Sequence, residues 1–203
     1  MSNLRTSTIN TLSQQQSGLS RRRFLGLGAA AAGAAAVALV PERAFAAVPS
    51  AKRAERVLSL FHTHTGERLK IAYCCDGQYQ PEALTQINHL LRDFRVDEVR
   101  PIDPKLLDLL HELGGTLESD APFHVISGYR SPRTNSMLRD RGGDHSGVAS
   151  KSLHMVGRAI DIRLPGVKLD HLRNAARSLQ LGGVGYYPSS NFVHVDTGRV
   201  RFW

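Results

Sequence analysis

The chain has 203 residues, of which 26 are Lys or Arg and 18 are Asp or Glu, and its formal net charge is +8 at neutral pH. Much of this excess lies near the N-terminus, because residues 47–203 contain 21 basic and 17 acidic residues. A net charge of +4 on that part argues against nucleic acid as a partner. The two cysteines, Cys74 and Cys75, are adjacent, which excludes a disulfide-based scaffold and favours packing roles.

Residues 1–46 have the features of an export signal. Arginines at positions 21–23 precede an apolar run rich in Ala and Gly, and residues 44–46 form an A-x-A cleavage motif. This twin-arginine pattern predicts transport by the Tat machinery, cleavage after about Ala46 and a periplasmic mature protein. The alternative is a retained anchor. No stable membrane anchor is expected, because the uncharged stretch 24–40 is shorter than the roughly 20 residues that span a bilayer.

The remaining residues, 47–203, are enough for one domain with an ordinary core. Their patterns predict strands at 57–61 and 69–74, and then a helix that begins at Pro81. A second helix is expected to begin with Asp103 as its N-cap and to end at Gly114.

Further along the chain, the patterns predict a strand at 123–127, a helix from Ser131 to Leu138 and a polar loop over 139–150. A helix at 169–179 and strands around Val184 and His194 complete the order. Helices come first and an antiparallel sheet dominates the end, so the fold class is α+β.

The motif that runs from Ser152 to Asp161 carries the most chemical information. It reads Ser-x-His-x-x-Gly-x-Ala-x-Asp and places His154 seven residues before Asp161. Seven residues span roughly 10 Å in a helix and roughly 23 Å in a strand, whereas zinc bonds of about 2 Å require converging side chains. A turn between the two residues would bring them together, and Gly157 is suited to it.

Alternation along two segments predicts the third member of this group. Ile160 and Ile162 fall on one face of a strand and Asp161 on the other, and in residues 192–196 His194 alternates with two valines. Neighbouring antiparallel strands would place Asp161 and His194 side by side. His154, Asp161 and His194 therefore form a ligand set suited to a catalytic zinc ion, Zn2+.

These motifs resemble the M15-type zinc peptidases, the superfamily that includes D-Ala-D-Ala carboxypeptidases and the hedgehog domain. The closest resemblance is to the MepK-like branch of periplasmic murein endopeptidases. It extends to residues 127–132, 182–188 and 201–203 and covers nearly all of the chain after residue 55. The resemblance implies a single domain whose antiparallel sheet carries the metal site, with helices packed on it. It also implies zinc-dependent hydrolysis of cross-links between peptidoglycan peptide stems.

The resemblance further implies roles for individual residues. Arg130 would bind a substrate carboxylate or stabilise the oxyanion of the reaction, and the candidate substrate-binding residues are Tyr129, Ser152 and Asn191. The carboxypeptidase branch has a glutamate three residues before its final histidine ligand, where this chain has Asn191. Asp196 is therefore the candidate catalytic carboxylate, although its spacing also allows it only to orient a histidine. His145 is the next candidate base.

Several alternatives remain open at this point. The same fold could act as a D,D-carboxypeptidase, and the missing glutamate is consistent with a catalytically silent module that binds the cell wall. The three candidate ligands could also form a hydrogen-bonded core triad without a metal. His62 and His64 share one face of a strand, but no Cys, Asp or Glu ligands are evident nearby, so they are expected to pack rather than to bind a metal.

Overall fold

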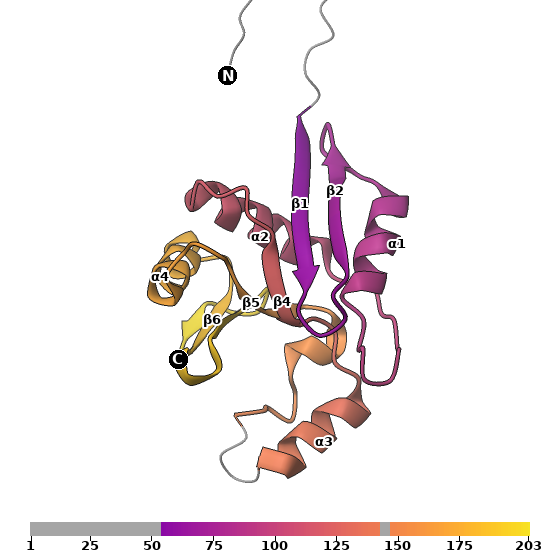
Figure 1. Cartoon of the computed structure of the whole chain (residues 1–203), viewed down its shortest axis with the longest axis vertical. Coiled ribbons are helices and arrows are strands. Elements are labelled where there is room, and N and C mark those ends of the chain that lie inside the picture. Colours follow the sequence, from indigo (N-terminus) through magenta and orange to yellow (C-terminus); the bar gives the residue numbers. More distant parts are fainter. Residues whose placement is uncertain (1–53, 143–146) are drawn as a thin grey trace, which may run out of the picture. The chain divides into compact units, whose positions relative to one another are not determined.

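The structure of the protein, a computed structural model, describes residues 54–142 and 147–203. The predicted export signal and His145 lie outside the described residues. The described part forms a single α+β domain in which four α-helices accompany one sheet of eight strands. Figure 1 shows how these elements are arranged. Within these residues, no helix combines the length and the apolar character needed to cross a membrane.

The sheet is mixed, with the strand order β3-β2-β1-β4-β5-β7-β6-β8. Its strands are β1 (Glu55–His62), β2 (Arg68–Cys75), β3 (Gln78–Tyr79), β4 (Phe123–Ser127), β5 (Ala159–Arg163), β6 (Gly183–Tyr187), β7 (Phe192–Asp196) and β8 (Arg201–Phe202). Antiparallel pairs dominate, as predicted, but β1 pairs with β4 and β6 pairs with β8 in parallel. The two parallel pairs join strands that are distant in sequence, so alternation within each strand does not reveal them.

Three of the four helices pack against the sheet. They are α1 (Pro81–Leu90), α2 (Pro104–Thr116) and α4 (Leu169–Leu179), which contact β2, β1 and the β6–β7 pair respectively. The core between them is apolar and includes the buried Leu106, Leu110, Ile160 and Val195. The fourth helix, α3 (Pro132–Gly142), lies apart from these three in Figure 1. Short 3-10 helices occur at η2 (Leu153–Val156) and η3 (Pro188–Ser190).

Two helices are longer than the sequence predicts. Helix α2 continues to Thr116 instead of ending at Gly114, and α3 continues to Gly142 instead of ending at Leu138. The extra turn of α3 contains Arg139 and Arg141. Arginine is a good helix former and interacts favourably with the C-terminal end of the helix dipole. The polar composition that indicated a loop is therefore that of a solvated last turn.

The two strands that carry the predicted ligands pair as expected. The antiparallel register of β5 and β7 places Asp161 opposite His194 and Ile160 opposite Val195. Ile160 and Val195 are fully buried in the core, so the polar pair lies on the other face of the sheet. The predicted turn at Gly157 is also present, since this glycine has a left-handed φ of 67°.

His62 and the cysteines have local packing roles. The ring of His62 is fully buried against Phe94, and its Nδ1 accepts the backbone N–H groups of His64 and Thr65. Burial lowers the pKa of His62 to about 4, so this imidazole is neutral at physiological pH. Both cysteines have free thiols, and Cys74 is buried.

The Gly157 turn yields a stability prediction. A Cβ atom at this position would lie 2.3 Å from the carbonyl oxygen of Pro101, and a left-handed conformation alone costs an L-residue about 1–2 kcal/mol. Gly157→Ala should therefore lower the free energy of unfolding by more than that amount, as measured by urea denaturation. Gly115→Ala is the matched control, because its Cβ meets no atom within 4 Å inside α2. Equal stability of the two variants would contradict this account of the turn.

Candidate metal centre

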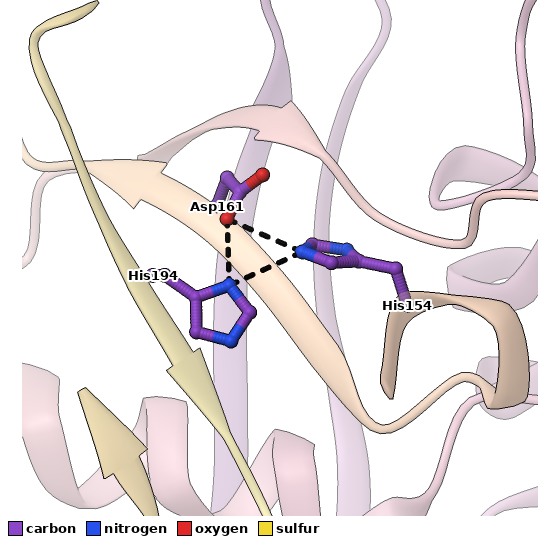
Figure 2. Close-up of side chains that lie close together, drawn as sticks. All are labelled: His154, Asp161 and His194. Carbon is purple, nitrogen blue, oxygen red and sulfur yellow. Dashed lines mark hydrogen bonds and ion pairs between the residues drawn. The ribbon is translucent and has the colours of Figure 1, made fainter. Parts of the chain in front are cut away.

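Three potential ligand atoms converge on the face of the sheet opposite the core. His154 comes from η2, Asp161 from β5 and His194 from β7, and Figure 2 shows their side chains pointing toward one another. His154 Nε2 lies 3.2 Å from His194 Nδ1 and 3.3 Å from Asp161 Oδ1, and His194 Nδ1 lies 2.9 Å from the same oxygen. All three residues are buried.

Backbone hydrogen bonds fix the position of His154. Its Nδ1 lies 2.7 Å from the carbonyl oxygen of Gly128, and its own carbonyl oxygen accepts the N–H of Arg130. Gly128 is required there, because a Cβ atom would lie 2.5 Å from the carbonyl oxygen of Leu91. The Gly157 carbonyl accepts the N–H of Asp103, the N-cap of α2. The loop that carries His154 is thus tied to β4 and to α2.

These contacts determine which ring nitrogens carry hydrogen. A carbonyl oxygen only accepts, so Nδ1 of His154 is the N–H and Nε2 presents its lone pair to the other ligands. The Nε2 atom of His194 lies 3.0 Å from Asp196 Oδ2. Although burial opposes ionisation, hydrogen bonds from His194 and Arg201 hold the pKa of Asp196 well below its usual value. His194 therefore donates from Nε2, and its Nδ1 faces Asp161.

The centre consequently brings together three atoms with lone pairs that can accept hydrogen bonds. A positive charge between these atoms is needed to offset their repulsion. Burial raises the pKa of Asp161, but the charges and hydrogen bonds of His154 and His194 lower it strongly, so Asp161 is ionised. Burial lowers the pKa of His194, yet its hydrogen bonds to Asp161 and Asp196 raise it above the ordinary value. Without a metal, a proton on His194 offsets the buried negative charge. A metal ion would replace that proton.

The geometry fits zinc. Tetrahedral bonds of about 2.0–2.2 Å place neighbouring ligand atoms roughly 3.3 Å apart, and the three observed separations lie between 2.9 and 3.3 Å. Among the described residues, only His154, Asp161 and His194 form such a His, Cys, Asp or Glu group. Three protein ligands and an open position are typical of a catalytic zinc site.

Asp196 lies behind His194 and is fully buried. Its Oδ2 accepts from Arg201 at 2.7 Å as well as from His194, and its Oδ1 accepts the N–H groups of Gly183 and Gly198. With donors on both oxygens, this carboxylate is placed to fix the orientation of the His194 ring.

A cavity of about 280 Å³ opens beside the three ligands. Most of its walls come from two parts of the chain, the segment that leads into η2 and the β6–β8 region, and Arg130 adds to them from the segment that follows β4. Besides the ligands, the described lining residues are Arg130, Gly147, Val148, Ala149, Lys151, Ser152, Leu153, Tyr187, Ser190, Phe192, Arg201 and Trp203. The cavity therefore combines cationic side chains with three aromatic rings next to the metal ligands.

Arg130 contacts one of the three candidate ligands and also lines this cavity. Its Nη2 lies 3.3 Å from Asp161 Oδ2 and 3.4 Å from Ser127 Oγ, and only 8% of the residue is exposed. Its buried Nε–H has no hydrogen-bond partner among the described residues. Arg130 thus forms an ion pair with one candidate metal ligand, while its Nε–H is left without a partner among the described residues.

The other candidate residues are dispersed. Ser152 lines the cavity and precedes η2, whereas Asn191 is exposed, has a left-handed φ of 53° and is not among the lining residues. Tyr129 is buried away from the cavity and donates its hydroxyl hydrogen to Glu98. His145 lies outside the described residues. Lys151, Tyr187, Arg201 and Trp203 line the cavity although motif spacing did not indicate them.

Comparison with known proteins identifies the family of this chain. An M15 peptidase family model, described as peptidoglycan L,D-endopeptidase MepK, matches residues 50–203. The chain belongs to this family. It is 45% identical over 183 residues to the peptidoglycan L,D-endopeptidase MepK of Escherichia coli K12, covering 90% of this chain and 96% of the relative. It is 40% identical over 184 residues to the probable peptidoglycan L,D-endopeptidase MepK of Haemophilus influenzae, covering 90% and 95%. The predicted resemblance and fold class are confirmed.

Proposed function

We propose that the mature protein is a zinc-dependent periplasmic endopeptidase that hydrolyses L,D cross-links between peptidoglycan peptide stems. The observation that carries this proposal is the convergence of His154, Asp161 and His194 beside a cavity, in a chain of a peptidase family. The bond type follows from the relatives, whose names describe L,D-endopeptidases of peptidoglycan.

The proposed chemistry divides between the metal and the chain. Zinc held by the three ligands would supply an activated water at neutral pH and polarise the scissile carbonyl group. Arg130 lines the cavity beside this position and is paired with Asp161. It would donate to the substrate oxygen on which negative charge develops, where a charged donor is most effective.

Asp196 has a supporting role in this proposal. Its carboxylate accepts a hydrogen bond from the Nε2–H of His194 and another from Arg201. The sequence left two roles open for Asp196, proton transfer and orientation of a histidine. Orientation fits its contacts better, because Asp196 is fully buried and does not line the cavity. Ser152 remains a proposed substrate contact because it lines the cavity.

Digestion of isolated sacculi tests the reaction. The purified mature protein should convert L,D-cross-linked muropeptide dimers to monomers, as seen by mass analysis. A chelator should stop the conversion and added zinc should restore it. Release of free D-Ala alone would indicate a D,D-carboxypeptidase instead. Wall binding without any product would indicate a silent binding module.

Metal analysis tests the ligand set. Wild-type protein should contain a single zinc ion per chain, and His194→Ala should lose both zinc and activity, because two ligands hold the ion weakly. Arg130→Ala is the contrasting variant, expected to retain zinc while its turnover falls about a hundredfold, the scale for loss of a transition-state donor. Full zinc content in the His194→Ala protein, measured by elemental analysis, would refute this ligand set.

The proposed export route rests on the arginines at 21–23 and has its own test. Replacing Arg21 and Arg22 by lysine should leave the precursor in the cytoplasm, because the Tat route reads the arginine pair. Cell fractionation with immunoblotting would show where the protein accumulates. Replacement of Arg43 by lysine serves as the control, since it lies outside the arginine pair. Normal periplasmic delivery of the double-lysine variant would contradict the proposed route.

A further inference from the structure

The aromatic wall of the cavity holds a tyrosine in an unusual hydrogen-bonding position. Tyr187 ends β6, and its ring stacks on Phe192 with 4.7 Å between centroids and 20° between planes. A Cβ atom at Gly147, where there is none, would lie 3.8 Å from the edge of the same ring. Tyr187 lines the cavity and is half-buried. Its ring is therefore packed on one face against Phe192, and its hydroxyl group is carried at the cavity wall.

Trp203 reaches the same wall across β6. A Cβ atom at Gly185 would lie 2.7 Å from the indole ring, so Trp203 occupies the space above a residue without a side chain. The indole centroid lies 5.4 Å from that of the His194 ring. Arg201 lies 4.9 Å from the indole on its way to Asp196. Trp203 is thus held beside the metal centre, yet half of its surface remains exposed.

The contact between these two residues determines the direction of the tyrosine hydroxyl. The Nε1–H group of Trp203 lies 2.8 Å from Tyr187 Oη. An indole N–H can only donate, so the phenol oxygen accepts this hydrogen bond and its own O–H hydrogen is available to another acceptor. No described residue accepts that hydrogen. Because Tyr187 lines the cavity, a ligand there is the natural acceptor.

We propose that Tyr187 is a substrate-binding residue whose hydroxyl donates a hydrogen bond to a carbonyl or carboxylate oxygen of the bound peptide stem, and that Trp203 is the positioning residue that orients it. This inference rests on the proposed function, because it takes a peptide stem as the ligand. The cavity supports this class of ligand. Arg130 and Lys151 supply further donors for oxygen atoms, and the rings of Phe192 and Trp203 offer apolar surface to aliphatic side chains.

Removal of the single hydroxyl group tests the first half of the proposal. Tyr187→Phe keeps the ring that stacks on Phe192, so zinc content and thermal unfolding should match the wild type. Its kcat/KM on a purified L,D-cross-linked muropeptide dimer should fall about tenfold, the effect of losing one hydrogen bond to substrate. Tyr186→Phe is the matched control. That neighbouring ring lies under Arg173 and lines a different cavity, so this variant should keep the wild-type kcat/KM.

A double-mutant cycle tests the positioning role of Trp203. Trp203→Phe removes the N–H donor but retains an aromatic ring. It should lower kcat/KM, but by no more than Tyr187→Phe does. If Trp203 acts through the Tyr187 hydroxyl, the double variant should be no worse than Tyr187→Phe alone. Losses that multiply independently would overturn the positioning role, as would wild-type kcat/KM in a folded Trp203→Phe protein.

A binding measurement separates this inference from the proposed function. Calorimetry with chelator-treated, metal-free protein and the same muropeptide dimer should show weaker binding by Tyr187→Phe than by the wild type and Tyr186→Phe. If Tyr187→Phe matched the wild type in both binding and kcat/KM, the inference would be overturned. Cleavage of the dimer by the wild type in the same experiment would still support the proposed function. Absence of wild-type cleavage would overturn the proposed function, and the binding comparison would still decide the role of Tyr187.

Discussion

Mutual repulsion among three buried acceptor atoms is the constraint on which the rest of this structure depends. His154 Nε2, His194 Nδ1 and Asp161 Oδ1 lie within 3.3 Å of one another, and a positive charge among them, either a proton on His194 or the proposed metal ion, offsets their repulsion. The fold provides for this by engaging the remaining hydrogen-bonding groups elsewhere. Gly128 accepts from one imidazole, Asp196 accepts from the other, and Arg130 holds the second oxygen of Asp161. The three remaining ligand atoms are thereby directed toward one another, at the position where the proposed metal ion would bind.

The sequence predicts this centre well because its geometry is local. Alternation in two short strands is enough to place Asp161 and His194 on one face, and their antiparallel pairing then makes them neighbours. The glycine three residues after His154 indicates the turn that brings the first histidine back to the sheet. Each inference needs only a few consecutive residues and one pairing. The convergence of these three side chains therefore follows from the sequence without knowledge of the whole fold.

The surroundings of the centre could not be predicted in the same way, because they depend on side-chain directions and distant pairings. Residues two apart in a strand are roughly 7 Å apart, yet the side chains of His194 and Asp196 meet at 3.0 Å. Tyr129 sits in a motif beside Arg130, but its side chain points to Glu98 and is buried. Arg201 and Trp203 reach the site because β8 pairs with β6 and because Gly183 and Gly185 leave space above that strand. The two glycines are visible in the sequence, but the side chains that fill their space are not.

The register in which β8 pairs with β6 also determines which side chains form this part of the cavity wall. The pairing joins Gly183 with Arg201 and Val184 with Phe202, so side chains of β8 alternate between the two faces of the sheet. A slip of one residue would turn Phe202 toward the metal ligands and carry Arg201 and Trp203 to the opposite side. On that side β6 presents the side chain of Val184, whereas Gly183 and Gly185 now leave space for the arginine and the indole. Gly183 and Gly185 thus allow only one register of β8 against β6, the one that places Arg201 and Trp203 over the two glycines.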